Sequence, residues 1–236
     1  MPTENTGLPA VCAVIVAAGS SRRMGGENKL LMPLCGRPML AHTLEAFERS
    51  RAVRDIVLVC REQDMETYRA LAESSRITKL RTMVQGGATR TDSVLAGVSA
   101  SPEDAALVAV HDGARPLVPP EVITKAILKA AKFGAAAPAI PVKDTIKVSK
   151  TGAVDETPDR STLFAVQTPQ VFDYALLLGA LQNAKQKGLS LTDDCSAVEA
   201  LGMTVLLTDG SEENIKITTP LDLDIAELIL KRRQTP

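Results

Sequence analysis

The sequence predicts an α/β protein with a mostly parallel sheet flanked by helices, and three observations support that fold class. Apolar runs of strand length alternate with helical stretches through the first half of the chain. Such an alternation forms a parallel sheet with right-handed crossovers. Several of these runs end in loops of small residues, and 236 residues, 45% of them hydrophobic, suffice for a sizeable core. We therefore predict a single domain over residues 1–236.

The first predicted strand, Val14 to Ala18, is followed by a loop of small residues from Gly19 to Gly25. In open α/β sheets, ligands bind at the carboxyl ends of the strands. Small side chains let a ligand approach the backbone N–H groups, and Arg22, Arg23 and Lys29 add three nearby cations. We interpret this loop as a cradle for a polyphosphate; an ordinary strand-to-helix turn with solvated arginines is the alternative.

This loop differs from the two best-known phosphate-binding sequences. The dinucleotide fingerprint requires Gly at its first, third and sixth positions, where this chain has Gly19, Ser21 and Met24. A P-loop requires Gly-Lys followed by Ser or Thr, but here Gly25 precedes Gly26. The loop matches neither motif.

The alternation continues with a helix from Pro38 to about Phe47, a strand Asp55–Cys60, a helix Gln63–Glu73 and a strand Thr82–Gln85. A second loop of small residues, Gly86 to Val94, then precedes another helix. Its glycines expose backbone donors and acceptors that suit the edge of a nucleobase. A simple helix cap is the alternative.

A third such loop follows the apolar strand that begins at Leu107, and it carries Asp112 and Arg115 to the same edge of the sheet as Lys29. We expect Asp112 to accept a hydrogen bond from ribose or to help hold Mg²⁺, which prefers hard oxygen ligands. Pairing between Asp112 and Arg115 alone is the alternative. Three loops that meet at one edge favour a ligand site.

The pattern changes after a predicted strand from Gly134 to Val142. Residues 144–155, with a turn at Lys150–Gly152, indicate a hairpin, which needs a further partner to be stable. We therefore expect an arm over roughly 142–166 that reaches another subunit. The remaining predicted elements are a helix from Tyr174 to Lys187, a helix starting at Thr192–Ser196, a strand Met203–Leu207 and a helix opened by Pro220, with frayed ends before Pro9 and after Leu230.

Composition excludes several function classes. The chain has 27 basic and 28 acidic residues and 3% aromatic residues, which is unlike a nucleic-acid-binding protein. It has no apolar run of the roughly 18 residues that span a membrane, and residues 1–9 lack a signal-peptide pattern. We expect a cytoplasmic enzyme without a nucleic-acid or membrane partner.

Cysteine and histidine chemistry is also disfavoured. The four cysteines, Cys12, Cys35, Cys60 and Cys195, lie far apart in the sequence, so we expect buried free thiols. Of the two histidines, His42 lies in a helical stretch, and His111 ends a strand and can orient its neighbour. Neither histidine lies in a nucleophile motif, so we expect the chemistry to rely on electrostatics.

The first loop resembles the signature of sugar-nucleotide pyrophosphorylases and cytidylyltransferases, and the whole chain resembles the IspD family of 2-C-methyl-D-erythritol 4-phosphate cytidylyltransferases. The matching stretches, in the family's order, are Ala17–Met24, Lys29, Gly86–Val94, Val110–Pro116, Pro141–Lys147, Arg160, Gln167–Gln170, Thr192–Ser196 and Asn214–Leu223. The resemblance implies a Rossmann-like α/β domain like that of nucleotide-diphospho-sugar transferases, with a protruding β-hairpin arm that completes a homodimer.

The resemblance also implies roles for individual residues. Arg23, Lys29 and Lys216 would be catalytic, around the α-phosphate of CTP. The CTP-binding residues would be Ala17, Ala18, Gly19, Gly86, Gly87, Ala88, Ser93, Asp112 and Gly113, and the acceptor-binding residues Thr145, Arg160, Arg115 and Thr192. Mg²⁺ would be held mainly by the phosphates, with Asp112 as a helper. Ala88 lacks the polar side chain of some relatives, so a base contact there must use the backbone.

The implied reaction is transfer of CMP from CTP to 2-C-methyl-D-erythritol 4-phosphate, in non-mevalonate isoprenoid biosynthesis. Ribitol 5-phosphate, another polyol phosphate, is the alternative acceptor. A non-catalytic nucleotide-binding protein on the same fold is the alternative from another class. The chain ends at Pro236, soon after the predicted closing helix, so we expect no fused cyclodiphosphate-forming enzyme.

Overall fold

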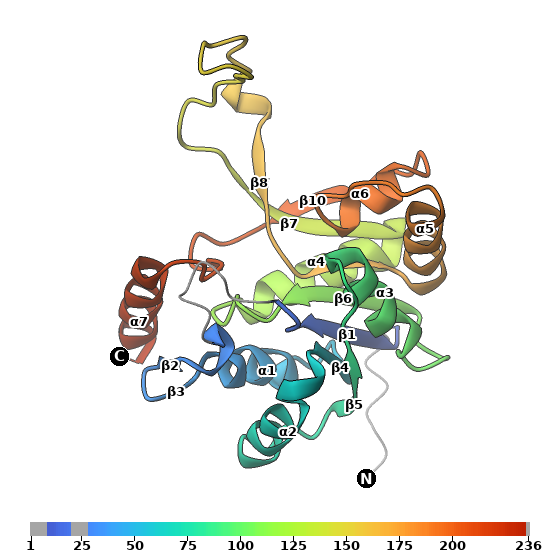
Figure 1. The fold of residues 1–236 in the computed structure, drawn as a ribbon, viewed down its shortest axis with the longest axis vertical. Helices are drawn as coiled ribbons and strands as arrows, with labels where there is room; N and C mark the ends of the chain where they lie inside the picture. The colour runs from blue at the N-terminus through green and yellow to red at the C-terminus, as the bar shows by residue number, and fades with distance from the viewer. Residues whose placement is uncertain (1–8, 20–27, 235–236) are drawn as a thin grey trace.

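The computed structural model describes residues 9–19 and 28–234, and its centre is a twisted, mostly parallel sheet (Figure 1). Within these residues, eight strands form the sheet in the order β10-β7-β9-β6-β1-β4-β5, with β8 paired to β7. The strands are β1 (Val11–Val16), β4 (Asp55–Cys60), β5 (Leu80–Gln85), β6 (Leu107–Asp112), β7 (Ala135–Pro141), β8 (Phe164–Val166), β9 (Gln170–Asp173) and β10 (Leu206–Asp209). The short strands β2 (Pro33–Leu34) and β3 (Arg37–Pro38) form a separate hairpin.

The helices are α1 (Met39–Arg49), α2 (Met65–Ser74), α3 (Arg90–Ser99), α4 (Pro120–Phe133), α5 (Tyr174–Gln186), α6 (Asp194–Glu199) and α7 (Pro220–Gln234). Short 3₁₀ turns are η2 (Lys29–Leu31), η3 (Glu62–Asp64) and η4 (Arg160–Thr162). Among the described residues, no helix is both long and apolar enough to cross a membrane. The four cysteines are free thiols as expected, but only Cys12, Cys60 and Cys195 are buried, and the expectation of burial is wrong for the partly exposed Cys35.

The order of the strands creates a switch point between β1 and β6. From β1 the chain moves outward to β4 and β5, all parallel, and then returns to β6 on the other side of β1. Crevices at the carboxyl ends of strands at such a point are the usual ligand sites of α/β sheets. The sheet is not wholly parallel, because β9 runs antiparallel between β6 and β7.

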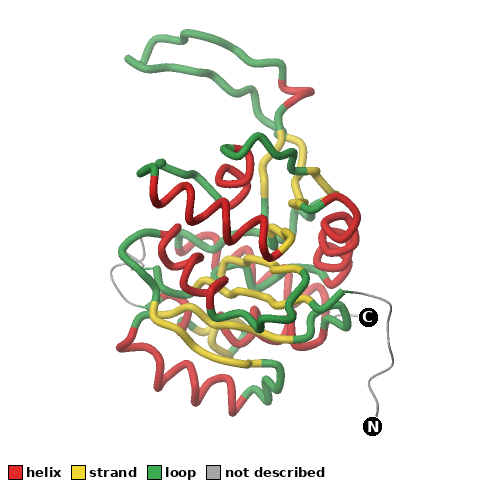
Figure 2. The backbone as a smooth tube through the Cα atoms, turned by 90° about the vertical axis from the view of Figure 1, so that its right-hand side faces the viewer, coloured by secondary structure: helices red, strands yellow, loops and turns green. Residues whose placement is uncertain are grey.

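Helices cover both faces of the sheet, as the two views show (Figures 1 and 2). Along β1, Ala13 and Ile15 belong to the core shared with α1, α2 and α4. The alternate residues Cys12 and Val14 belong to the core shared with α3, α5 and α6. A continuous apolar run is therefore required, because both faces of the strand are buried.

The chain leaves the body between β7 and β8 and returns as a long arm (Figures 1 and 2). The predicted hairpin over 144–155 is wrong in detail, because its regular pairing is reduced to an isolated bridge between Val148 and Glu156. Ile146 and Val154 are 39% and 59% exposed. A two-stranded segment without a packing surface is marginal in water, which accounts for the irregular backbone.

Several predicted boundaries are also wrong. The first strand, predicted from Val14 to Ala18, spans Val11–Val16. The strand expected at Met203–Leu207 begins only at Leu206, because the backbone of Met203 still closes the end of α6 through Val198. The fraying expected after Leu230 does not occur up to Gln234, where α7 ends. Arg233 fixes that last turn by donating to the carbonyl of Leu117 at 2.9 Å. Residues 235–236 and the stretch before Pro9 that was also expected to fray lie outside the described residues.

Helix α3 packs closely on the sheet through Gly97. A Cβ atom there would lie 2.4 Å from Val14 Cγ1 and 2.6 Å from Val59 Cγ2. We expect Gly97→Ala to lower the free energy of unfolding by about 1–3 kcal/mol, because overpacking displaces the helix. Gly179→Ala in α5, where a Cβ meets nothing within 4 Å, should instead stabilise the helix by up to about 1 kcal/mol. Urea unfolding tests the pair; equal effects would contradict this packing account.

Candidate active site

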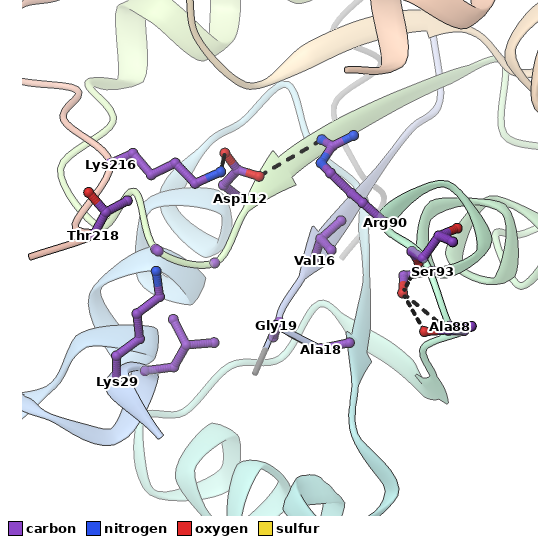
Figure 3. Close-up of a pocket in the computed structure, with 16 residues that line it drawn as sticks. Val16, Ala18, Gly19, Lys29, Ala88, Arg90, Ser93, Asp112, Lys216 and Thr218 are labelled. Atoms are coloured by element: carbon purple, nitrogen blue, oxygen red, sulfur yellow. Dashed lines mark hydrogen bonds and ion pairs between the residues drawn. The ribbon is translucent and has the colours of Figure 1, made fainter. Parts of the chain in front are cut away.

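A cavity of about 660 Å³ opens at the carboxyl ends of β1, β5 and β6 (Figure 3). Ten of the residues proposed from the sequence line it: Ala17, Ala18, Gly19, Lys29, Gly87, Ala88, Ser93, Asp112, Gly113 and Lys216. The other described residues of the lining are Val16, Leu30, Thr89, Arg90, Ala114 and Thr218. The three loops expected to meet at one edge therefore do meet, while Arg23 lies outside the described residues.

Two lysines reach the cavity from the same side, opposite Ala88 and Ser93 (Figure 3). Lys29 opens the turn η2, and its ammonium donates to the carbonyl of Ile217 at 2.8 Å. Lys216 lies in the segment before α7, and its ammonium is 2.9 Å from Asp112 Oδ2. Residues separated by most of the chain thus place two positive charges at one end of the cavity.

The loop between β5 and α3 forms the opposite wall. Thr89 caps α3 by accepting from the backbone N–H of Asp92, and Ser93 Oγ accepts from Gly87 N at 3.1 Å. A Cβ on Gly86 would lie 2.5 Å from Ala18 Cβ, and one on Gly87 would lie 2.3 Å from Asp92 Cβ. Gly86 does not line this cavity; its lack of a side chain lets the first two loops touch.

Asp112, at the end of β6, lies among three cations. Besides Lys216, Arg115 Nε is 3.5 Å and Arg90 is 3.8 Å from its carboxylate. Burial alone would raise the pKa of Asp112, but Lys216, Arg90 and Arg115 lower it to about 2. The carboxylate is therefore ionised at neutral pH. The alternative that Asp112 pairs with Arg115 alone is wrong, because Lys216 and Arg90 also lie beside it.

A buried hydrogen-bond chain orients the backbone at Asp112. Burial lowers the pKa of His111 to about 4, so its ring is neutral at pH 7. The ring nitrogen Nε2 faces the carbonyl of Arg115 at 3.1 Å and must donate, because a carbonyl only accepts. Nδ1 then accepts from Thr168 Oγ1 at 3.0 Å, and that oxygen accepts from Asp112 N at 3.2 Å. The expectation that His111 orients its neighbour agrees with this geometry.

Arg90 is the main residue that the sequence analysis missed. It lines the cavity at the start of α3 and donates both terminal nitrogens to Asp194, each at 2.8 Å. Burial would lower the pKa of Arg90, but the charges of Asp194 and Asp112 outweigh it and raise that pKa. In the sequence, an arginine in the first turn of a helix cannot be told apart from an ordinary solvent-exposed arginine, which is why Arg90 was missed. Only the fold brings it to the buried Asp194 at the start of α6.

The proposed acceptor-binding residues are not brought into this cavity. Thr145 and Arg160 lie in the arm, where Arg160 Nη1 donates to the carbonyl of Lys143 at 2.8 Å. Thr192 lies before α6, with its hydroxyl 2.9 Å from Ser196 Oγ. Arg115 contacts Asp112 and donates to the carbonyl of Asn214 without lining the cavity.

The described residues suit a magnesium ion held chiefly by phosphates. Asp112 is the only carboxylate in the described lining, and no group of three His, Cys, Asp or Glu side chains within the described residues could form a metal cage. Mg²⁺ commonly uses one or two carboxylates together with substrate phosphates. Asp112 fits that limited role as a single carboxylate in the described lining.

The whole chain is similar to known cytidylyltransferases. A family model described as IspD, 2-C-methyl-D-erythritol 4-phosphate cytidylyltransferase, matches residues 11–232. A curated relative of that name from Desulforamulus reducens is 48% identical over 226 residues, which cover 94% of this chain and 97% of the relative.

Solved structures agree with the sequence comparison. The 4-diphosphocytidyl-2C-methyl-D-erythritol synthase of Anaerococcus prevotii superposes with a TM-score of 0.85 at 31% identity, covering 95% of this chain and 97% of that one. The 2-C-methyl-D-erythritol 4-phosphate cytidylyltransferase of Thermus thermophilus gives 0.77 at 33% identity, covering 92% and 98%. Because the match extends over nearly the full length of both chains and includes the loops that line the cavity, the chain belongs to the IspD family of cytidylyltransferases.

Proposed function

We propose that this protein transfers CMP from CTP to 2-C-methyl-D-erythritol 4-phosphate, releasing pyrophosphate, as a step of non-mevalonate isoprenoid biosynthesis. The observation that carries the proposal is the cavity at the switch point, where Lys29 and Lys216 face a backbone loop at Gly87 and Ala88. This is an arrangement for a triphosphate at one end and a base at the other, in a chain of the IspD family.

The acceptor needs no general base from the protein. The second ionisation of a phosphate monoester lies near pH ~6, so its oxygen is already a nucleophile at neutral pH. That oxygen attacks the α-phosphorus of CTP and forms the new P–O bond. The bond from the α-phosphorus to the bridging oxygen of the β-phosphate breaks, and pyrophosphate leaves with its electron pair. The main barrier to the reaction is electrostatic repulsion, because the acceptor phosphate and the triphosphate of CTP are both negatively charged.

We assign Lys29 and Lys216, with Arg23, to the charge that develops on the α-phosphate. Cations that are fixed before the reaction stabilise such charge without the cost of reorganisation. The ion pair of Lys216 with Asp112 at 2.9 Å supports this role, because it keeps a cation at the cavity before any phosphate arrives. When bound, Mg²⁺ would neutralise further charge on the phosphates and on the departing pyrophosphate.

The cytosine is assigned to the loop that begins at Gly86. The packing of Gly87 on Asp92 leaves no space for a side chain there, so the cavity wall at Gly87 is formed by backbone groups. Ser93 supports this wall by accepting from Gly87 N and donating to the carbonyl of Thr89. Ala88 contributes only backbone polar groups to a base.

We also propose that the arm completes a homodimer and carries Thr145 and Arg160 to the acceptor site of the partner. Its exposed apolar side chains support this, since Val154 is 59% and Phe164 is 45% exposed. Thr192 and Arg115 would contribute to acceptor binding from the body of the protein. A cytoplasmic location is part of the proposal, and the four free thiols suit a reducing compartment.

Pyrophosphate release tests the proposed function. Purified protein is incubated with CTP and Mg²⁺, and methylerythritol phosphate and ribitol 5-phosphate are offered separately. We expect release with methylerythritol phosphate and little with ribitol phosphate. Release with ribitol phosphate alone would keep the mechanism and overturn the acceptor. Release with neither, despite CTP binding, would favour a non-catalytic nucleotide-binding protein.

A further inference from the structure

A buried polar cluster lies immediately beside Lys29 and has no part in the mechanism described above. It consists of Asn28, Asp64 and Tyr68, with Arg61 at its edge. Asn28 Nδ2 donates to Asp64 Oδ1 at 3.1 Å and to the Tyr68 hydroxyl oxygen at 2.9 Å. Tyr68 is fully buried and Asp64 is 7% exposed, so both are core positions where apolar residues are usual.

The amide of Asn28 fixes the backbone that carries Lys29. Asn28 is the N-cap of the turn η2, and its Oδ1 accepts from Leu30 N at 3.2 Å. The same oxygen is 3.1 Å from the Tyr68 hydroxyl. The side chain of Asn28 thus links the turn η2 to α2. The buried side chain of Leu30 anchors the other side of this turn.

The cluster is satisfied within itself. Arg61 donates to Asp64 through Nε at 2.5 Å and Nη2 at 3.1 Å, which balances the buried carboxylate. Burial raises the pKa of Tyr68 to about 12, so the hydroxyl keeps its proton at neutral pH. Buried polar groups stabilise a protein less than apolar packing does, but satisfied networks specify one geometry.

We propose that Asn28, held by Tyr68 and Asp64, is a positioning residue that fixes Lys29 where charge develops on the α-phosphate. The inference rests on the proposed function, in which Lys29 is catalytic. The ammonium of Lys29 is directed from its other end by the carbonyl of Ile217 at 2.8 Å. Fixing the backbone at one end and the ammonium at the other restricts the long side chain, and a misplaced group can lower a rate by roughly 100-fold.

Tyr68→Phe tests the proposal, because it removes only the hydroxyl and keeps the buried ring. We expect kcat to fall by roughly 5- to 50-fold, with KM for CTP changed by less than about 2-fold. In a Lys29→Ala background the same change should alter kcat by less than about 2-fold, because no lysine remains to be positioned. An equal factor in both backgrounds would mean a general structural role and would overturn the inference.

Tyr174→Phe is the matched control. It removes the hydroxyl of the other tyrosine in the chain, which packs on the opposite face of the sheet. We expect it to leave kcat unchanged in both backgrounds. Asn28→Ala, which removes the cap directly, should repeat the pattern of Tyr68→Phe.

The rate of chemical labelling of Lys29 tests whether its side chain is held in place, and this measurement does not depend on enzyme activity. We expect an amine-reactive reagent to modify Lys29 several-fold faster in Tyr68→Phe than in the wild type, as followed by peptide mass spectrometry. Lys79, which donates to the carbonyl of Ser50 at 2.7 Å, is the internal control and should not change. If the wild type transfers no CMP, the proposed function fails, whereas an unchanged labelling rate of Lys29 overturns the positioning role itself.

Discussion

Replacing Lys29 with alanine is expected to lower kcat by about 100- to 1000-fold. Losing one preorganised hydrogen-bond donor in a catalytic site usually lowers kcat by this factor. KM for CTP should change far less, because in the proposed complex the backbone at Gly87 and Ala88 and the ammonium of Lys216 would still contact the nucleotide. The difference between the two parameters matters, because an interaction that forms mainly in the transition state affects kcat. Steady-state kinetics at saturating acceptor measure both.

Lys125→Ala is the control for that experiment. Lys125 contacts the exposed Asp209 at 2.9 Å and does not line the cavity. Its replacement should leave kcat unchanged. A Lys29→Ala variant that kept near wild-type turnover would remove Lys29 from the mechanism.

Mixing two inactive variants, Arg160→Ala and Lys29→Ala, is expected to restore activity. In the mixed dimer, the body that retains Lys29 receives an arm that retains Arg160, so one site is complete. Random exchange makes about half of the dimers mixed, so about a quarter of the wild-type activity should return. The geometry favours this result, because the arm extends away from its own body and Arg160 does not line its own cavity.

The mixing experiment needs two controls. Differently tagged subunits must first be shown to exchange. A mixture of Lys29→Ala with Lys216→Ala should stay inactive, because both residues line the same cavity of one subunit. If exchange occurs and the Arg160→Ala mixture also stays inactive, Arg160 does not act on the partner.

Local patterns were sufficient to predict the strands and loops that form the cavity. β4 matches its predicted bounds of Asp55–Cys60, and the loops after β1, β5 and β6 meet as the fold class requires. Parallel strands that are buried on both faces have continuous apolar runs, so they can be predicted from the sequence. Helix α4 escaped the sequence analysis, although Pro120 at its first turn and Gly134 with φ of 87° after it are common boundary residues.

Long-range contacts account for what could not be predicted. Strand β9 is short, and Gln170 within it accepts from the backbone of Asp194 and Cys195, which only the fold brings near. The same holds for the pairing of Arg90 with Asp194 and for the cluster around Asn28. The structure shows which proposed residues line the cavity, but the roles of all the proposed site residues remain predictions. Thr145 and Arg160 lie in the arm, and Arg23 lies outside the described residues.

The pH dependence of kcat/KM for the acceptor tests most directly the central claim that fixed cations, without a protein base, drive the transfer. We expect log kcat/KM to rise through the second pKa of the free acceptor phosphate, near ~6, and then to stay level to about pH 9. With a phosphonate analogue of the acceptor, whose second pKa is higher, the rising limb should move by that difference. A limb that stays in place when the acceptor is changed would belong to an ionising group of the protein and would contradict the account.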